Sequence, residues 1–563
     1  MASYEFGFDD FQNLGCHHLE DGKSVLIAAP TGAGKTIVGE FATFLSEKNG
    51  NRCFYTTPIK ALSNQKYQDL VKLYGDSEVG LLTGDSSINS EARIVVMTTE
   101  VLRNMIYAGS NAIEDLGYVV MDEVHYLADK FRGAVWEEIL IHLPERIQIV
   151  SLSATVSNAE EFGDWLKTVR GETEVVLSEI RPVPLYQHIL IGNRILDLFV
   201  DEGRVNPEIL RIEKNSIKKV PGGSKSWKES KFNSIKSLTR PEIVEKLSER
   251  GFLPAIFFIF SRAGCDGAVS SCIREGLSLT NSLEKEEIRR VIALKTHELP
   301  SEDFGVLGFH EWAQALERGI AAHHAGLLPM FKETIEELFQ RGLLKIVFAT
   351  ETLALGINMP ARSVVLEKLV KWNGESHVNV SPGEYTQLTG RAGRRGIDVE
   401  GNALILWNEQ MDSSIAAGLA STRTYPLRSS FSPTYNMSAN LISRFGHERA
   451  RKSLGFSFAQ FQADKAVVGL AKQIAKNEIA IKTLIEGSQS DLGDMGEYMK
   501  ARFAIKELEA QFSSRRITGG SRRKHHENIE EQISEHRRSL KNHPCHSCPN
   551  RESNARGFEK AAR

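Results

Sequence analysis

The chain is 563 residues long and 41% of its residues are hydrophobic. Because single hydrophobic cores stop growing at roughly 250 to 300 residues, this length predicts several domains. The formal net charge of −3 excludes a protein that binds polyanions through bulk positive charge, so any nucleic-acid contact must come from local surfaces. Six cysteines favour a reducing compartment over a disulfide scaffold. The longest apolar runs, such as 253–260, are too short to cross a bilayer, and no signal peptide is apparent, so we expect a soluble, cytoplasmic protein.

The first 180 residues alternate short apolar runs with amphipathic polar segments. This alternation predicts a doubly wound parallel sheet covered by helices. The expected strands are 25–29, 53–56, 79–82, 94–97, 118–121 and 147–152.

A glycine-containing loop follows the first of these runs and precedes a helical stretch. In that context a sequence ending in Gly-Lys-Thr predicts a phosphate-binding loop, because glycines let backbone N–H groups close around phosphate oxygens. Lys35 is expected to reach the β and γ phosphates, and the Thr36 hydroxyl to hold Mg²⁺. The expected ATP-binding residues of the loop are Ala29, Pro30, Thr31, Gly32, Ala33, Gly34, Lys35 and Thr36.

An Asp-Glu-Val-His sequence at 122–125 ends the apolar run 116–121. The carboxyl ends of parallel strands form the edge at which α/β sheets bind ligands. Asp122 is therefore expected to face the metal, and Glu123 to orient or deprotonate the attacking water. The alternative is a solvated acidic turn, which the phosphate loop upstream disfavours.

A second series of apolar runs lies at 255–260, 345–349, 364–366 and 403–406 and predicts a second α/β domain that ends near 426. Residues 211–240 before it are rich in Lys and Arg around Pro221 and read as a flexible basic insertion, with a solvated linker favoured over a nucleic-acid contact. Asn373-Gly374 between two β-rich stretches predicts a hairpin. Charged helical segments at 470–485, 495–512 and 527–540 follow.

The C-terminal sequence contains Cys545 and Cys548 in a CxxC pattern with histidines nearby. Zinc requires four ligands in a tetrahedral array, and four ligands from six consecutive residues would be cramped. Ordinary turn residues are therefore the favoured interpretation, with a metal site as the alternative.

Together, these motifs resemble those of DExH-box superfamily 2 helicases in the superkiller-like group, which includes exosome-assisting RNA helicases, and most closely the bacterial HelY-type members. The similarity covers roughly residues 5–470. It implies two RecA-like domains, at 1–180 and 251–426, joined by a linker at 181–250 that carries the basic insertion. It also implies the start of a winged-helix segment at 427–468 and a helical arm at 469–563. The bundle that closes the strand channel in the family has no counterpart, which suggests a shortened chain.

The resemblance assigns roles in the ATP site to residues of both domains. Arg391 and Arg394 would reach the γ phosphate across the cleft, with Arg394 as the finger and Gln387 nearby, whereas Arg395 could equally be a surface charge. His125 would couple hydrolysis to domain movement through the hydroxyls of Ser153 and Thr155. Adenine would be read by the ring of Phe6 and the amide of Gln12, and the nucleotide would also be contacted by Gly356 and Asn358.

Strand binding would use phosphate contacts, because a translocating motor holds the backbone without reading sequence. Each motif alone would be an ordinary βα turn. The expected nucleic-acid-binding residues are Pro58, Lys60, Gly84, Asp85, Thr99, Arg262 and Thr350. The hairpin at Asn373-Gly374 occupies the place of one that splits duplexes in the family, with a purely structural hairpin as the alternative.

The expected protein is thus a monomeric ATP-dependent helicase or translocase that uses ATP and Mg²⁺ and acts on single-stranded or partly duplex nucleic acid. RNA is favoured over DNA only by the subgroup resemblance, and a DNA-repair helicase of the same group is the main competing function. A generic phosphate-loop ATPase or GTPase switch is disfavoured by the arginines of the second domain, and a non-catalytic clamp is disfavoured because Lys35, Glu123 and Arg394 are all intact. An ATPase that nucleic acid stimulates without processive unwinding is a further alternative.

Overall fold

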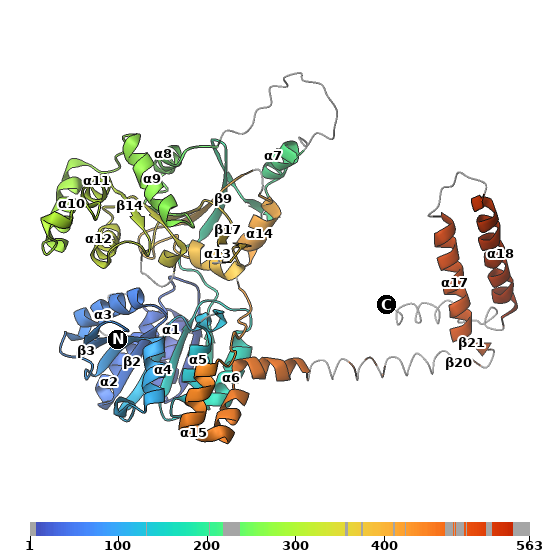
Figure 1. Cartoon of the computed structure of the whole chain (residues 1–563), viewed down its shortest axis with the longest axis horizontal. Coiled ribbons are helices and arrows are strands. Elements are labelled where there is room, and N and C mark those ends of the chain that lie inside the picture. Colours follow the sequence, from blue (N-terminus) through green and yellow to red (C-terminus); the bar gives the residue numbers. More distant parts are fainter. Residues whose placement is uncertain are drawn as a thin grey trace, which may run out of the picture. The chain divides into compact units, whose positions relative to one another are not determined.

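The computed structural model describes residues 7–130, 132–201, 203–217, 237–354, 359–372, 375–408, 411–422, 424–467, 489–490, 493–513 and 521–543, together with residues 474, 477 and 479. The chain divides into two compact units, 1–460 and 461–563. The first unit contains two α/β domains. Each has a mostly parallel sheet at its centre and helices on both faces of that sheet (Figure 1). This arrangement confirms the predicted pair of RecA-like domains.

The first domain contains an eight-stranded sheet in the order β4-β3-β5-β2-β6-β7-β1-β8. Its neighbouring strands run parallel except for β4, which is antiparallel to β3. The strands are β1 (Ser24–Ala28), β2 (Arg52–Thr57), β3 (Val79–Leu82), β4 (Ser87–Ile88), β5 (Ile94–Thr98), β6 (Leu116–Met121), β7 (Gln148–Ser153) and β8 (Thr173–Leu177). The helices around them are α1 (Asp10–Glu20), α2 (Thr36–Asn49), α3 (Lys60–Tyr74), α4 (Thr99–Ala108), α5 (Ala134–His142) and α6 (Ala159–Arg170).

The second domain contains a seven-stranded sheet in the order β10-β9-β19-β16-β13-β15-β14. Its strands are β9 (Leu185–Ile191), β10 (Arg194–Asp197), β13 (Ala255–Phe258), β14 (Ile320–His323), β15 (Ile346–Ala349), β16 (Ser363–Leu366) and β19 (Gly401–Leu406). The main helices are α7 (Pro207–Ile217), α8 (Arg240–Glu249), α9 (Arg262–Arg274), α10 (Ser282–Lys295), α11 (Phe309–Glu317), α12 (Pro329–Gln340), α13 (Pro382–Thr389) and α14 (Ser413–Ser421). Two short pairs, β11 (Phe199–Asp201) with β12 (Arg204–Val205) and β17 (Val370–Trp372) with β18 (His377–Asn379), lie outside this sheet.

Part of the predicted linker belongs to the second domain. Strand β9 pairs in parallel with β19, and helix α8 packs Val244 and Leu247 into the core of this domain. The sequence of β9 does not predict a strand, because Gln187 and His188 interrupt its apolar run. His188 is nevertheless buried, and its two ring nitrogens lie 2.9 Å from Asp197 Oδ1 and 2.8 Å from Asn402 Oδ1. These contacts satisfy a polar side chain inside a sheet. Most of the predicted basic insertion, at 218–236, lies outside the described residues.

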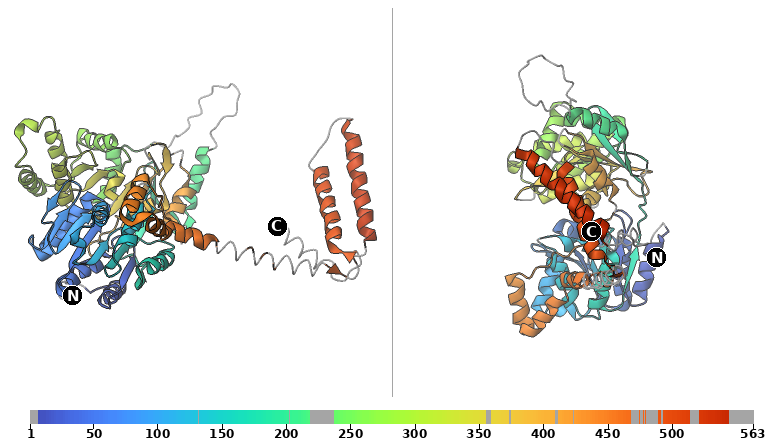
Figure 2. Two further views of the ribbon diagram at one scale, coloured as in Figure 1. Left: turned by 60° about the horizontal axis from the view of Figure 1, so that its bottom comes forward. Right: turned by 90° about the vertical axis from the view of Figure 1, so that its right-hand side faces the viewer.

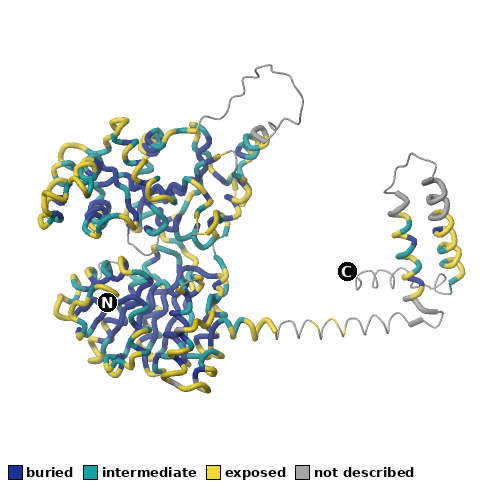
Figure 3. Tube along the Cα trace, viewed as in Figure 1, coloured by how far each residue is buried: buried dark blue, intermediate teal, exposed yellow. Residues whose placement is uncertain are grey.

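The cores of both domains are the sheets themselves, as the dark blue strands of Figure 3 show. In the first domain Val25, Ile27 and Leu152 are completely buried, and in the second domain Phe257 and Phe348 are. Continuous apolar strands are typical of parallel sheets covered on both faces. Such sheets hold their carboxyl ends rigidly, and the loops at those ends carry the motifs predicted above.

After the second domain the chain returns to the first. Tyr425 forms a parallel bridge with Val156, and Asn158 exchanges hydrogen bonds of 2.8 and 2.6 Å with the backbone of Leu427. Helix α15 (Tyr435–Gly455), kinked at Gly446, then lies beside the first domain in both views of Figure 2. Phe458 completes an aromatic cluster with Phe162 and Trp165 of α6. The described chain therefore crosses between the domains twice. Whether 427–468 begins a winged helix stays a prediction.

In the second unit, helices α17 (Met495–Ser513) and α18 (Ser521–Asn542) pack side by side, so two of the three predicted helical segments are confirmed as helices. Met499, Ile505 and Ile533 are buried between them, and Arg537 pairs with Glu509 at 2.5 Å. A short pair, β20 (Gln489–Ser490) with β21 (Gly493–Asp494), precedes α17. The predicted helix at 470–485 lies almost entirely outside the described residues, as do Cys545 and Cys548. No helix in the described part of the chain is long and apolar enough to span a membrane.

Candidate nucleotide and nucleic-acid sites

The phosphate loop joins the buried strand β1 to helix α2, as predicted. Gly32 and Gly34 adopt φ angles of 81° and 86°, which only glycine tolerates readily, so the loop backbone can curl over the start of α2. Lys35 Nζ donates to the carbonyl oxygens of Ala29 (2.8 Å) and Pro30 (3.1 Å). Burial lowers the pKa of Lys35, although the carboxylates of Glu123 and Asp122 oppose this effect. A Cβ added at Gly32 would meet nothing within 4 Å. The loop therefore has the room and the half-buried cation that can hold a phosphate chain.

Asp122 and Glu123 lie at the carboxyl end of β6, where the sequence predicts them. Asp122 is buried, its Oδ2 accepts a 3.1 Å hydrogen bond from the Tyr55 hydroxyl, and its Oδ1 accepts one of 2.9 Å from the Glu123 N–H. Burial and the neighbouring Glu123 raise the pKa of Asp122 to about 6. Glu123 has a φ of 53°, a strained value for a residue with a side chain. The Asp122 carboxylate and the hydroxyl of Thr36, the first residue of α2, are oxygen donors of the kind that a divalent cation prefers.

His125 connects this loop to its neighbours. Its Nδ1 accepts a 3.2 Å hydrogen bond from the backbone N–H of Ala154, and its Nε2 lies 2.7 Å from the side-chain amide of Gln387 in the second domain. Burial and the nearby Lys35 lower the pKa of His125 to about 3, so the ring is neutral. The sequence predicts contact through hydroxyls of Ser153 and Thr155. Instead the ring meets the backbone between them, and the Ser153 hydroxyl has no hydrogen-bond partner among the described residues.

Three arginines follow α13, and the structure gives each a different environment. Arg391 is buried, which lowers its pKa, while Glu123 across the cleft opposes that shift. Arg394 forms a bidentate ion pair with Asp398 at 2.7 and 2.8 Å, so it is held within its own domain. Arg395 crosses to the first domain: its Nη1 donates to the Ala33 carbonyl at 2.8 Å and its guanidinium pairs with Asp9. Arg395 is therefore an exposed charge that also contacts the phosphate loop of the first domain.

The adenine-reading element is partly described. Gln12 lies at the start of α1, and its Nε2 donates to the Gly34 carbonyl at 3.0 Å while its Oε1 accepts from the Asp9 N–H at 2.8 Å. Its amide therefore lies against the phosphate loop. Phe6, Gly356 and Asn358 lie outside the described residues, and their nucleotide contacts stay predictions.

The predicted strand contacts of the first domain gather at the carboxyl ends of β2, β3 and β5. Lys60 Nζ forms a 2.5 Å ion pair with Asp85, and Gly84 next to Asp85 has open space around it. Pro58 precedes α3 on the same edge, because Thr57 of β2 lies in register with Thr98 of β5. Thr99 is different: it is buried, and its hydroxyl donates to the Thr57 carbonyl at 3.0 Å. In this structure the Thr99 side chain joins two strand ends.

Predicted strand contacts of the second domain lie at the ends of β13 and β15. Arg262 is exposed at the start of α9, and the Thr350 hydroxyl lies 2.9 Å from that of Thr352. Sequence reasoning misses two neighbours of these residues, His323 and His324. The ring of His323 lies 2.9 Å from Glu336, and the ring of His324 lies 2.9 Å from Asp266. Two adjacent histidines ending an apolar strand are the signal that points to them.

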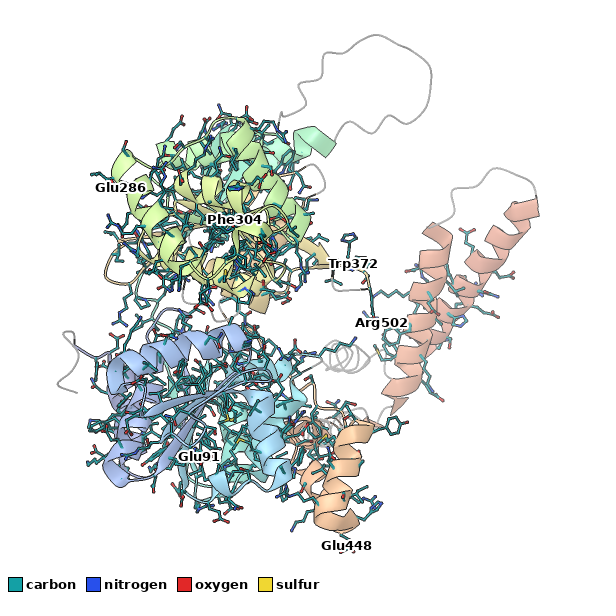
Figure 4. The ribbon with its side chains drawn as sticks, turned by 60° about the vertical axis from the view of Figure 1, so that its left-hand side comes forward. Glu91, Glu286, Phe304, Trp372, Glu448 and Arg502 are labelled. Carbon is teal, nitrogen blue, oxygen red and sulfur yellow. The ribbon has the colours of Figure 1, made fainter. Side chains whose placement is uncertain are left out.

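A cavity of about 760 Å³ lies between the two domains on the side of His125 and Gln387. Its wall includes Lys371 from β17, which is missed as a site residue from the sequence. Figure 4 shows Trp372, the next residue, at the margin of the second domain. The other lining residues include Tyr126, Lys130, Phe260, Glu351, Glu384, Tyr425 and Arg428.

Comparison with known proteins supports this arrangement. Residues 9–162 match the DEAD/DEAH box helicase model and residues 278–396 match the helicase conserved C-terminal domain. The chain is 54% identical over 518 residues to the probable helicase HelY of Mycobacterium tuberculosis, covering 90% of this chain and 57% of that protein. It is 38% identical to the exosome RNA helicase MTR4 of Homo sapiens (84% of this chain, 46% of that protein). It is 40% identical to superkiller complex protein 2 of Mus musculus (83% and 38%).

The chain thus spans about half the length of these curated relatives. The two matched models cover the phosphate loop, the Asp-Glu-Val-His loop and the arginines after α13. The chain therefore contains a DEAD/DEAH box helicase domain and a helicase conserved C-terminal domain, and it is related to the HelY and superkiller-like helicases.

Proposed function

We propose that the chain is an ATP-dependent helicase or translocase that steps along a single nucleic-acid strand, with RNA as the favoured strand. The observation that carries this proposal is the contact between His125 of the Asp-Glu-Val-His loop and Gln387 of the second domain. Through this contact, ATP hydrolysis in the first domain would respond to the position of the second. RNA is favoured because MTR4 and another relative, DExH10 of Arabidopsis thaliana, are named as RNA helicases.

Residues of both domains would share the work on ATP. Lys35 and the loop N–H groups would bind the β and γ phosphates, and Gln12 would contact the base. Mg²⁺, held by Thr36 and Asp122, would neutralise phosphate charge when bound. Glu123 would orient and deprotonate the attacking water. Arg391 would stabilise negative charge on the γ phosphate, and so would Arg394 once it exchanges Asp398 for the phosphate.

Nucleic acid would lie across the carboxyl edges of both sheets. Lys60, Arg262 and Thr350 would contact phosphates, so the strand would be held without sequence readout. Closure of the cleft around ATP would shift one set of contacts relative to the other. Because the relatives are roughly twice as long as this chain, unwinding of long duplexes is a property of the whole protein in this proposal, and the chain would act as a monomer.

A steady-state ATPase assay with a 20-nucleotide oligouridine, the matching DNA and no nucleic acid tests the proposal. We expect hydrolysis that RNA stimulates more than DNA, and loss of that hydrolysis in Lys35→Ala. Greater stimulation by DNA would replace RNA with DNA as the substrate. Hydrolysis that neither strand changes would overturn the helicase function and revive a simple phosphate-loop ATPase.

A further inference from the structure

The hairpin β17–β18 carries a half-buried lysine on one side and an exposed aromatic ring on the other. Trp372 is 54% exposed and its ring meets that of His377 edge-on, with centroids 5.2 Å apart. Lys371 is its neighbour in β17, and successive side chains of a strand point to opposite faces. The Lys371 side chain accordingly points inward and is only 15% exposed. Because the two residues are neighbours in β17, a shift of this strand at Trp372 would also move Lys371.

Lys371 joins two segments of the site. Its Nζ lies 2.5 Å from Glu351 Oε2 and 2.6 Å from Glu384 Oε1. Burial alone would lower the pKa of Lys371, but hydrogen bonds to the two glutamates outweigh it and raise the pKa. Glu351 directly follows Thr350, a predicted phosphate contact at the end of β15. The lysine therefore links the hairpin to the strand-binding edge and to helix α13 with full positive charge.

Helix α13 continues this connection to the ATP site. Glu384 is its third residue and also caps it, because its carboxylate accepts a 2.8 Å hydrogen bond from the Ser381 N–H. Gln387 lies three residues later, on the same face of the helix. Gln387 contacts His125, which in turn accepts from Ala154. The interdomain cavity borders Lys371, Glu384, Gln387 and His125, so α13 has room to shift.

We propose that Lys371 is a positioning residue that transmits the position of the β17–β18 hairpin to the catalytic cleft. A nucleic-acid base stacked on Trp372 would move the hairpin, and Lys371 would carry that movement through Glu384 to Gln387 and His125. Aromatic side chains are sequence-tolerant platforms for bases, which suits a ring exposed at the margin of the domain. This inference rests on the proposed function, since it explains how a bound strand raises ATP turnover.

The test compares Lys371→Met with Lys368→Met, using the full chain. Lys368 lies on the connection between β16 and β17, three residues before Lys371, is exposed, and has no ion pair among the described residues, so it is a matched control. For each protein, ATP turnover is measured without nucleic acid and with saturating 20-nucleotide oligouridine. Affinity for the same labelled strand is measured by fluorescence anisotropy, and folding by the melting temperature.

We expect Lys371→Met to retain basal ATP turnover and strand affinity within about threefold. Its stimulation by the strand should fall by about fivefold or more, which is the usual size of coupling between two sites. Lys368→Met should behave as wild type. Lys371→Arg should restore most of the stimulation, because it keeps the charge. Trp372→Ala should reproduce the loss of stimulation.

Unchanged stimulation in Lys371→Met would overturn the proposal. So would a loss of strand affinity that accounts for the lower stimulation, because Lys371 would then be a strand contact. If Lys371→Met melts early, Glu384→Gln is the decisive variant: glutamine preserves the capping interaction at this position, and only the ion pair is weakened. Absence of stimulation in the wild type would instead refute the proposed function itself.

Discussion

His125 and Gln387 lie 262 residues apart in the chain, yet the imidazole Nε2 of one and the side-chain amide of the other are 2.7 Å apart across the interdomain cleft. The same imidazole accepts from the backbone of Ala154. One neutral ring therefore contacts three segments: the loop that would position water, the end of β7 and the helix before the arginines. Such a junction can report domain closure to the hydrolytic loop.

Gln387→Ala removes the contact of the His125 ring with the second domain and leaves its contact with Ala154. We expect stimulated turnover to fall about tenfold, which corresponds to the loss of a positioned hydrogen bond worth roughly 1.4 kcal/mol. The KM for ATP should change little, because Gln387 contacts the coupling histidine. Steady-state kinetics over a range of ATP concentrations measure both values. A rise in KM with unchanged maximal turnover would assign Gln387 to nucleotide binding instead.

Glu123→Gln should retain ATP binding and lose turnover by about 10² to 10⁴, the usual contribution of a positioned general base. Fluorescent-nucleotide binding and single-turnover hydrolysis separate the two effects. Glu249→Gln, at the exposed end of α8, is the control and should match wild type. Undiminished hydrolysis in Glu123→Gln would remove this residue from the proposed role.

The Arg395–Asp9 ion pair predicts a charge effect on ATP affinity. Arg395→Gln and Asp9→Asn should each raise the KM for ATP about threefold to tenfold, because a partly exposed pair contributes up to about 1 kcal/mol and the contact with Ala33 adds to it. Asparagine caps helices as well as aspartate does, so Asp9→Asn leaves α1 intact. The double variant should resemble the single variants. Additive increases in KM would show that the two residues act independently.

Glu137 predicts a pH-dependent stability. This buried carboxyl of α5 accepts hydrogen bonds from the Ser429 hydroxyl and the Phe458 N–H, and burial raises its pKa to about 7. Because the folded pKa exceeds the unfolded value, the stability that Glu137 contributes is fully present below about pH 4.5 and is lost as the pH rises through about 7.

The loss is on the order of 3 kcal/mol, since each pKa unit corresponds to about 1.4 kcal/mol. Glu137→Gln cannot ionise. Its melting temperature should therefore improve relative to wild type between pH 5 and pH 8. Melting curves of both proteins in matched buffers measure this difference, and parallel pH profiles would contradict the prediction.

The sequence predicts correctly those parts of the site whose residues all lie in one short stretch of the chain. Gly32, Lys35 and Asp122 lie where the phosphate loop and the strand-end carboxylates predict them, because strand, turn and helix signals lie within a few residues of each motif. Asp398 and Lys371 are not predictable in this way. Asp398 lies only four residues after Arg394, but the segment lacks the helical pattern that would predict their pairing. Nothing near Lys371 in the sequence shows that its side chain lies half-buried between two glutamates.

Long-range partners limit the prediction most. Arg395 contacts Asp9 and Ala33, which lie more than 360 residues earlier, so a local pattern cannot distinguish it from a surface charge. Strand β9 is missed for a related reason. Its His188 becomes acceptable in a sheet only when Asp197 and Asn402 meet its two ring nitrogens.

The double passage of the chain between the domains has a mechanical consequence. Residues 178–184 lead into the second domain, and residues from Tyr425 to Leu427 return to the first, where they are fastened to Val156 and Asn158. Two bodies joined at two separate points share an axis of rotation through both points. Swinging about that axis is easy, whereas twisting and sliding strain one attachment or the other. ATP binding and hydrolysis would therefore drive rotation of the domains about one defined axis. A cut in either connection would leave the domains joined at one point, and that axis would no longer be fixed.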